Sequence, residues 1–492
     1  MKTIKELVNK LDYTCICGEV DREITQVIYD SRKIVEGCLF ICIKGANFNG
    51  HDYAKEACEK KAACIVVCED VNEPEACNTT IIRVEDTRYA MAFISAQWFG
   101  NPAEKLNVIG ITGTKGKTTT TYLVKSILEQ AGKKVGLIGT IETIIGKEHI
   151  PANNTTPESY ILQETFAKMV DAGLDSVVME VSSQGLMLHR TQGFVFDIGI
   201  FTNLEPDHIG PNEHESFEDY MYCKGLLFKQ CKTGIVNCDD KHYKDVIKDH
   251  TCKLLTYGLD NEAAYKAENM QLVREKGHIG VAFDVIGRTS MQVEIPTPGR
   301  FSVYNALTAI AICDQFGVEE TAVKAALMQA SVKGRIELVK VSNEFTLMID
   351  YAHNAMALES LLGTLKEYEP NRLVSVFGCG GNRSKLRRFE MGEVSGKLAD
   401  FTIITSDNPR FEEPEEIMND IETGMKKTDG IYIKIADRKE AIRYAILNGQ
   451  PGDIIVLAGK GHEDYQEIKG VKYPMDERVL IREIMEEENL SV

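Results

Sequence analysis

The stretch at residues 107–121 most constrains what this chain can fold into. It reads NVIGITGTKGKTTTT, an apolar run followed by a glycine-rich turn, Lys117 and a row of threonines. The apolar run predicts a buried strand, and the helical spacing of apolar residues over 119–131 predicts a helix after the turn. Such a turn binds anions, because backbone N–H groups and the helix dipole point at one place. We therefore expect a phosphate-binding loop in which Lys117 reaches the β- and γ-phosphates and the Thr118 hydroxyl ligates Mg²⁺.

This loop departs from the usual P-loop pattern. Ile111 stands where the pattern has its first glycine, so only the shorter Gly113-x-x-Gly116-Lys117-Thr118 remains. The alternative is a glycine turn ahead of an ordinary helix. Nucleotide binding is our working hypothesis.

Composition narrows the partners of the chain. A length of 492 residues predicts about three domains. The net charge of −18 argues against nucleic acid and anionic membrane as partners. The 14 cysteines are scattered without zinc-ligand spacing, and the N-terminus has no apolar signal core. We expect a monomeric cytoplasmic protein with reduced cysteines and no membrane span.

The order of apolar runs and helical stretches predicts an α/β protein of three domains. Residues 1–100 read as a small α/β domain. Residues 101–335 alternate strand and helix, as in a doubly wound parallel sheet. Residues 336–492 repeat the alternation and predict a Rossmann-like sheet with its functional loops along one edge. The GxGxxG motif with a downstream acid is absent from the sequence, which argues against NAD binding.

Several polar residues follow the apolar runs, where ligands bind in such sheets. Glu180 follows one run and suits a Mg²⁺ ligand, although it could equally be a solvated strand end. His208 follows another, where histidine is more often structural. Lys224 shares a helix face with Tyr220, so burial would lower its pKa unless the ammonium reaches water.

Two further candidate residues each have a binding role and a purely structural role as alternatives. Ser31, in an Asp-Ser-Arg loop, would hold a sugar or diphosphate or simply form a turn. Asn305, at a helix start, would read an adenine edge or cap the helix. The tips of the last sheet carry Asp350, His353, Arg383, Asp407, Asn408, Arg410, Gly459 and Glu463.

Taken together, these stretches resemble the Mur ligase family, in the family's order and over almost the whole chain. The matching motifs are GTKGKTTT, NNTTPES, EVSSQGLMLHR, NLEPDHIG, the Lys224 helix, PGRFSVYNA, KGRIE, DYAHN, GCGGNR, DNPR and AGKGHEDYQ. The resemblance implies an ATP-dependent amide ligase of peptidoglycan precursor synthesis, hence of cell-wall biogenesis, cell shape and cell division. Its implied reaction joins meso-2,6-diaminopimelate to UDP-N-acetylmuramoyl-L-Ala-D-Glu through an acyl phosphate.

The resemblance also implies roles for particular residues. The 1–100 domain would bind the UDP substrate, the 101–335 domain would be the ATPase and the 336–492 domain would bind the amino acid. ATP would contact Gly113, Thr114, Lys115, Gly116, Lys117, Thr118, Thr119, Asn305 and Arg335. The UDP-linked dipeptide would contact Ser31, Thr155, Thr156, Ser182 and Arg190. The acceptor amino acid would contact Arg383, Asp407, Asn408, Pro409, Arg410, Gly459 and Glu463. Mg²⁺ would be held by Thr118, Glu180, His208 and Lys224, the last as N6-carboxylysine formed with CO₂.

Elementary chemistry agrees with this implied reaction. A carboxylate does not react with an amine, because its oxygen is a poor leaving group, and phosphoryl transfer to it supplies a good one. That transfer needs cations such as Lys117 and Mg²⁺ around the phosphates. The attacking ammonium must also lose a proton, and His353 or Asp350 would assist. The Arg410 guanidinium suits the second carboxylate of diaminopimelate, and Glu463 its distal ammonium.

The departures from the family leave alternatives open. Gly210 stands where an acid is common, Leu188 where a polar residue is common, and Lys115 where asparagine is usual. Lysine or another amino acid therefore remains a possible acceptor. A folylpolyglutamate-type ligase and a non-catalytic nucleotide-dependent scaffold are further alternatives. The Asp-Ser-Arg domain argues against the former, and Glu180, His208 and Lys224 together argue against the latter.

Overall fold

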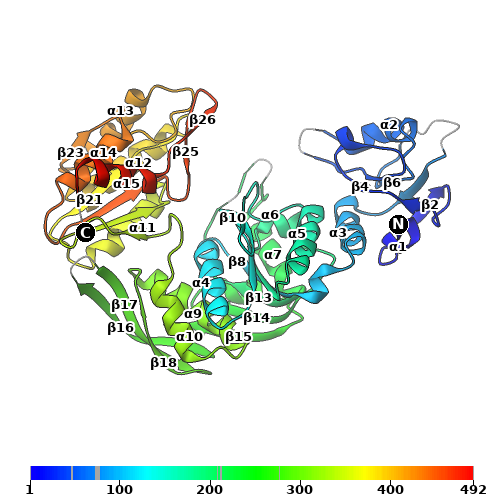
Figure 1. Cartoon of the computed structure of the whole chain (residues 1–492), viewed down its shortest axis with the longest axis horizontal. Helices are drawn as coiled ribbons and strands as arrows, with labels where there is room; N and C mark the ends of the chain where they lie inside the picture. Colours follow the sequence, from blue (N-terminus) through cyan, green and yellow to red (C-terminus); the bar gives the residue numbers. More distant parts are fainter. Residues whose placement is uncertain are drawn as a thin grey trace. The chain divides into compact units, whose positions relative to one another are not determined.

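The computed structural model describes residues 2–45, 48–71, 78–207, 209–210, 213–275 and 278–490. Their contacts form two compact units, Met1–Ala264 with Thr308–Val318, and Tyr265–Leu307 with Glu319–Val492. Figure 1 shows both units, with many of their helices and strands labelled. The described part of the chain contains no helix that is both long and apolar enough to cross a membrane. The cysteines in that part are free thiols.

The first unit begins with a five-stranded sheet in the order β2-β7-β6-β5-β4. Its strands pair in parallel except β2, which is antiparallel to β7. The elements here are β1 (Lys2–Thr3), α1 (Ile4–Leu7), β2 (Thr14–Cys17), β3 (Glu23–Ile24), β4 (Val27–Ile28), η1 (Ser31–Lys33), β5 (Leu39–Ile41), η2 (Gly50–Tyr53), α2 (Ala54–Glu59), β6 (Cys64–Val67), β7 (Thr80–Arg83) and α3 (Thr87–Trp98). Val66 and Ile65 on β6 belong to separate apolar clusters, so this strand is buried on both faces and reads as a continuous apolar run.

The second sheet of this unit is built around β8 (Asn107–Thr112), the apolar run that precedes the glycine turn. Its strands follow the order β11-β10-β9-β12-β8-β13-β14-β15. Strands β9, β12, β8, β13, β14 and β15 are parallel, whereas β10 and β11 form an antiparallel hairpin at the edge. This arrangement confirms the doubly wound sheet expected from the sequence.

Helices connect these parallel strands. The short η3 (Pro102–Lys105) precedes β8, and the elements after β8 are α4 (Lys117–Gln130), β9 (Val135–Ile138), β10 (Glu142–Ile145), β11 (Glu148–Pro151), α5 (Ser159–Asp171), β12 (Ser176–Glu180), α6 (Ser183–Met187), β13 (Phe196–Phe201), α7 (Phe217–Gly225), η4 (Leu226–Lys229), β14 (Cys231–Asn237), α8 (Tyr243–Val246) and β15 (Lys253–Gly258). Leu162 and Phe166 of α5 and Leu227 and Phe228 of η4 pack on the sheet residue Met179 in one buried cluster. These contacts fix the strand ends that carry the polar loops.

The second unit starts with three antiparallel strands that we did not expect from the sequence. They are β16 (Tyr265–Glu275), β17 (His278–Gly287) and β18 (Met291–Ile295), and α9 (Arg300–Asp314) and α10 (Glu320–Gln329) follow. Tyr368 joins this hairpin to the rest of the unit, because its hydroxyl donates to Gly280 O at 2.7 Å and is buried.

The rest of the second unit is a six-stranded sheet in the order β19-β20-β24-β21-β22-β23, parallel except for β19. Its elements are β19 (Glu337–Val339), β20 (Thr346–Asp350), α11 (Ala355–Lys366), β21 (Leu373–Phe377), α12 (Lys385–Leu398), β22 (Phe401–Ile404), α13 (Pro414–Met425), β23 (Tyr432–Lys434), α14 (Arg438–Leu447), β24 (Ile454–Ala458), β25 (Tyr465–Ile468), β26 (Val471–Pro474) and α15 (Glu477–Glu487). Ile442 of α14 and Ile484 of α15 pack on one face of this sheet. The predicted Rossmann-like architecture is therefore confirmed, with its loops at the carboxyl ends of β22 and β24.

Candidate active site

The glycine turn after β8 forms the expected strand–turn–helix. Gly113 has φ of 150° and Gly116 has φ of 86°, values that favour glycine. A Cβ at Gly113 would lie 1.9 Å from Thr202 Oγ1, so no side chain fits there. Helix α4 begins at Lys117, earlier than predicted, and Gly116 provides no side-chain cap to its first N–H groups. The loop therefore presents a helix N-terminus of the kind that binds phosphate.

The end of β13 holds this loop in shape. The Lys115 N–H donates to Asn203 Oδ1 at 2.8 Å, and Asn203 Nδ2 returns a bond to Lys115 O at 3.1 Å. Thr202 Oγ1 donates to the same carbonyl at 2.7 Å. We did not identify these two residues from the sequence, although both directly follow a buried apolar run.

Two lysines meet at one carbonyl of the loop. Lys117 Nζ donates to Gly113 O at 2.8 Å, and Lys224 Nζ donates to the same oxygen at 3.0 Å. Lys224 is 1% exposed and lies 4.4 Å from the centre of the Tyr220 ring, which confirms the helix face expected from the sequence. Burial, and then the charge of Lys117, lower the pKa of Lys224 well below its ordinary value. Lys224 is therefore a buried amine that readily becomes neutral.

Glu180, at the end of β12, is also buried and collects hydroxyl donors. Its Oε1 accepts from Thr118 Oγ1 at 3.0 Å and from the Thr140 N–H at 2.8 Å. Its Oε2 accepts from Thr140 Oγ1 at 3.0 Å, and that hydroxyl lies 3.0 Å from Thr155 Oγ1. A hydroxyl and a carboxylate side by side at a phosphate loop are hard oxygen ligands that fit Mg²⁺.

The residues implied for the dipeptide lie beside Glu180. Thr156 Oγ1 donates to Glu180 O at 3.0 Å and accepts from the Ser182 N–H at 2.9 Å. Arg190 Nη1 donates to Thr156 O at 3.0 Å, and its guanidinium pairs with Glu158 at 2.8 Å. The phosphate loop and these residues therefore form one polar cluster.

Ser31 does not join this cluster. Ser31 begins η1 in the N-terminal sheet, where Asp30 caps the turn and binds the Arg32 guanidinium at 2.9 Å, as the simple turn alternative predicts. His208 lies outside the described residues.

A different histidine, His214, occupies the loop before α7. Its side chain is buried, with Nδ1 at 2.8 Å from Asp219 Oδ2 and Nε2 at 2.8 Å from Ser183 Oγ. It thereby joins the start of α6 to the Lys224 helix. Its position just ahead of a helix was a signal in the sequence that we did not use.

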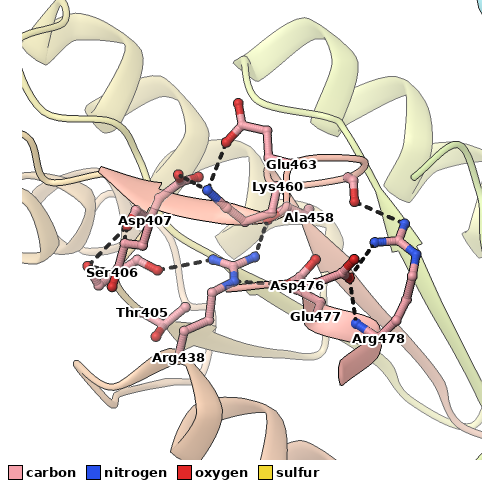
Figure 2. Close-up of polar contacts among 12 residues, drawn as sticks. Thr405, Ser406, Asp407, Arg438, Ala458, Lys460, Glu463, Asp476, Glu477 and Arg478 are labelled. Carbon is pink, nitrogen blue, oxygen red and sulfur yellow. Dashed lines mark hydrogen bonds and ion pairs between the residues drawn. The ribbon is translucent and has the colours of Figure 1, made fainter. Parts of the chain in front are cut away.

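Among the residues implied for the acceptor, Asp407 and Glu463 lie close together, in the loops that follow β22 and β24 (Figure 2). Asp407 and Asn408 are buried, and Asn408 Nδ2 donates to Glu463 Oε2 at 2.9 Å. Gly459 has φ of 107°, and a Cβ there would lie 3.1 Å from Asp407 Oδ2. Pro409 packs against the glycine loop, because a Cβ at Gly381 would lie 1.8 Å from Pro409 O.

Lys460 is a member of this group that sequence reasoning missed. It is 0% exposed, and its Nζ donates to Glu463 Oε2 at 2.7 Å and to Asn408 Oδ1 at 3.0 Å. Burial alone would raise the pKa of Glu463, yet the Lys460 ammonium and the Asn408 amide together outweigh burial, and the pKa is lowered. The carboxylate is therefore held ionised.

Arg410 has partners within the protein. Its guanidinium pairs with Glu467 at 3.0 Å and donates to Gly381 O at 2.9 Å, so it is already engaged within the protein. Arg383 is exposed. An acceptor carboxylate would have to share Arg410 with Glu467.

A buried ion pair underlies these loops (Figure 2). Arg438 Nε donates to Glu477 Oε1 at 2.8 Å, and the two side chains are 1% and 0% exposed. The other nitrogens of Arg438 donate to Ser406 O at 3.1 Å and to Ala458 O at 3.0 Å. Arg438 thus fixes the residue before Asp407 and the residue before Gly459.

Arg335 and His353 lie beside Tyr351, and Asp350 directly precedes it. Arg335 lies 4.7 Å above the Tyr351 ring, and His353 Nδ1 lies 2.8 Å from Tyr351 O. Burial raises the pKa of Asp350, which accepts the Ile336 and Ala352 N–H groups. Asn305 is buried on α9.

The fold and these loops define an α/β protein with a phosphate-binding loop and a separate polar site on a Rossmann-like sheet. Three family models match it: the Mur ligase family catalytic domain at residues 23–99, the Mur ligase middle domain at 111–313 and the Mur ligase glutamate ligase domain at 334–461. The chain belongs to the Mur ligase family.

Known relatives cover nearly the whole chain. The UDP-N-acetylmuramoyl-L-alanyl-D-glutamate–2,6-diaminopimelate ligase of Caldanaerobacter subterraneus subsp. tengcongensis is 47% identical over 474 residues, 96% of this chain and 97% of the relative. The ligase of the same name from Bacillus licheniformis is 41% identical, covering 99% of this chain and 100% of the relative. A solved structure of a ligase of that name matches with a TM-score of 0.75 at 29% identity over 100% of both chains. The MurF ligase from Thermotoga maritima shares the fold, with a TM-score of 0.59 at 18% identity over 94% and 97% of the two chains.

Proposed function

We propose that this protein is an ATP-dependent ligase that joins meso-2,6-diaminopimelate to UDP-N-acetylmuramoyl-L-Ala-D-Glu. The relatives of that name support the substrates. The observation that carries the proposal is the buried carboxylate of Glu180, which accepts from Thr118 of the phosphate loop and, through Thr140, adjoins Thr155. A nucleotide and a second substrate would then meet at one place.

We propose a division of labour among three domains. Residues 1–100 bind the UDP part with Ser31, residues 101–335 bind ATP, and residues 336–492 bind the amino acid. The three family models fall within or close to these ranges. Asn305 would contact adenine and Arg335 the phosphates. We place the reaction in the cytoplasm, where ATP is available, and we expect a monomer, which sedimentation can test.

The proposed chemistry begins with transfer of the γ-phosphoryl group to the D-Glu carboxylate. The N–H groups of residues 113–119 orient the phosphates, and Lys117 turns from Gly113 O toward them. Mg²⁺ held by Thr118, Glu180 and His208 would neutralise phosphate charge when bound. Thr155, Thr156, Ser182 and Arg190 hold the peptide so that its carboxylate faces the phosphate. The amine of the acceptor then displaces phosphate, with His353 or Asp350 taking its proton.

We further propose that Lys224 is carbamylated. A neutral amine adds to CO₂, forming an N–C bond and releasing one proton, and the low pKa of Lys224 favours the neutral amine. The carbamate would bring a negative oxygen to the metal side of the loop. Native protein incubated with ¹³C-bicarbonate should show the ¹³C NMR signal of a carbamate, and Lys224→Met should not. Native protein without this signal would refute the carbamate.

The acceptor itself needs a direct test, because Arg410 is already paired with Glu467. This observation favours L-lysine as the second candidate acceptor. Phosphate release should require ATP, the UDP-linked dipeptide and one amino acid from a panel of meso-diaminopimelate, L-lysine and L-ornithine. We expect the fastest phosphate release with meso-diaminopimelate. A wide margin for L-lysine would refute the proposed acceptor, and release of phosphate without any amino acid would refute the ligase.

A further inference from the structure

Lys460 lies at the centre of the residues that hold the acceptor in our proposal (Figure 2). Its Nζ contacts Glu463 Oε2 at 2.7 Å, Asn408 Oδ1 at 3.0 Å and Asp407 Oδ1 at 3.8 Å. It also donates to Tyr465 O. One fully buried ammonium therefore faces two carboxylates from two different loops.

These bonds fix the orientation of Asn408 and Glu463. Asn408 Oδ1 accepts from Lys460 and from the Glu467 N–H at 2.8 Å, so its amide nitrogen must point to Glu463. The Lys460 ammonium and the Asn408 amide both donate to Glu463 Oε2, and neither bond involves Glu463 Oε1. Lys460 thereby sets which polar atoms of the two side chains remain for a ligand.

Its charge matters as much as its bonds. Lys460 lies between two carboxylates, Glu463 at 2.7 Å and Asp407 at 3.8 Å, and its charge offsets part of theirs. In a buried site the potential of one cation extends over several ångströms, because little water screens it.

We propose that Lys460 determines acceptor specificity, by offsetting the negative charges of Asp407 and Glu463, which would otherwise repel the second carboxylate of the acceptor, and by fixing Asn408 and Glu463. This inference rests on the proposed ligase function. Diaminopimelate and L-lysine differ by a single carboxylate. The ratio of their kcat/KM values therefore reports how favourable the site is for that carboxylate.

The experiment measures this ratio in single variants. In Lys460→Met the diaminopimelate-to-lysine ratio should fall at least tenfold, about 1.4 kcal/mol, with unchanged KM for ATP. Lys460→Arg keeps the charge and should retain most of the ratio. The matched control is Lys472→Met, because Lys472 lies 4.0 Å from the Tyr465 ring on the exposed strand β26. An unchanged ratio in folded Lys460→Met overturns the proposal.

A second pair of variants covers the case in which Lys460→Met does not fold. Glu463→Gln and the double variant Glu463→Gln/Lys460→Met differ only at Lys460, and the double variant removes one charge of each sign. The ratio should be lower in the double variant, and equal ratios overturn the proposal. Native enzyme that is inactive with every acceptor would refute the ligase function instead, so the two failures are distinguishable.

Discussion

Replacing Arg438 with methionine should destabilise the second unit severely. The change leaves the Glu477 carboxylate, 0% exposed, without its cation, and it removes the donors to Ser406 O and Ala458 O. Breaking one partner of a buried ion pair costs about 3–5 kcal/mol. At about 2–4 °C per kcal/mol for a unit of this size, the melting temperature should fall by about 6–20 °C.

Differential scanning calorimetry of the full chain measures this loss directly. Arg443→Met is the matched control, because Arg443 lies on the same helix α14 but pairs with acids at the protein surface and should change little. The double variant Arg438→Met/Glu477→Leu should regain much of the loss, since it leaves no lone buried charge. A melting temperature for Arg438→Met equal to that of Arg443→Met would refute the reasoning.

Three further predictions concern the phosphate loop and the pH dependence of stability. Lys117→Met should abolish phosphate release while Lys125→Met on the same helix keeps it; activity in the former would exclude a role at the phosphates. Gly113→Ala should weaken ATP binding by at least tenfold in calorimetric titration, because its Cβ would lie 1.9 Å from a threonine oxygen; unchanged affinity would contradict the loop geometry. Burial, then the charge of Arg335, lower the pKa of His462 from 6.5 to about 4, so the unfolded chain takes up the proton first on acidification. The contribution of neutral His462 to the free energy of unfolding should be complete above about pH 6.5 and lost as the pH falls toward 4. His462→Gln should flatten the pH dependence of the free energy of unfolding over this range. An identical pH dependence in the variant would contradict this prediction.

The elements that sequence reasoning predicted best are those with local causes. The strand, glycine turn and helix at residues 107–130 follow from an apolar run, two glycines and helical periodicity, all of which act over a few residues. The placement of Lys224 with Tyr220 also follows from spacing on one helix. Once this helix face packs on the sheet, Lys224 is buried and its pKa is lowered.

The features that were missed depend on partners distant in the chain. Strand β16 alternates buried and half-buried residues only over its first four positions, and its pairing with β17 in an antiparallel hairpin was overlooked within a region expected to alternate strand and helix. The pairing of Arg410 with Glu467 was not foreseen, because sequence spacing does not reveal that Glu467 folds back to it. Lys460 was passed over because lysine between two glycines reads as solvent-exposed, and only the packing of two loops encloses it.

The contacts of Glu180 argue against a protein that uses nucleotide only as a switch. A switch needs the phosphate loop to sense the γ-phosphate, and Thr118 and Lys117 would suffice for that. Here the Glu180 carboxylate also accepts from Thr140, which adjoins Thr155. The backbone carbonyl of Glu180 accepts from Thr156. Contacts from this one residue to both the loop and these threonines would couple phosphate binding to a second site. Phosphoryl transfer to a bound carboxylate requires such coupling, because the two reacting groups must be held together while water is excluded.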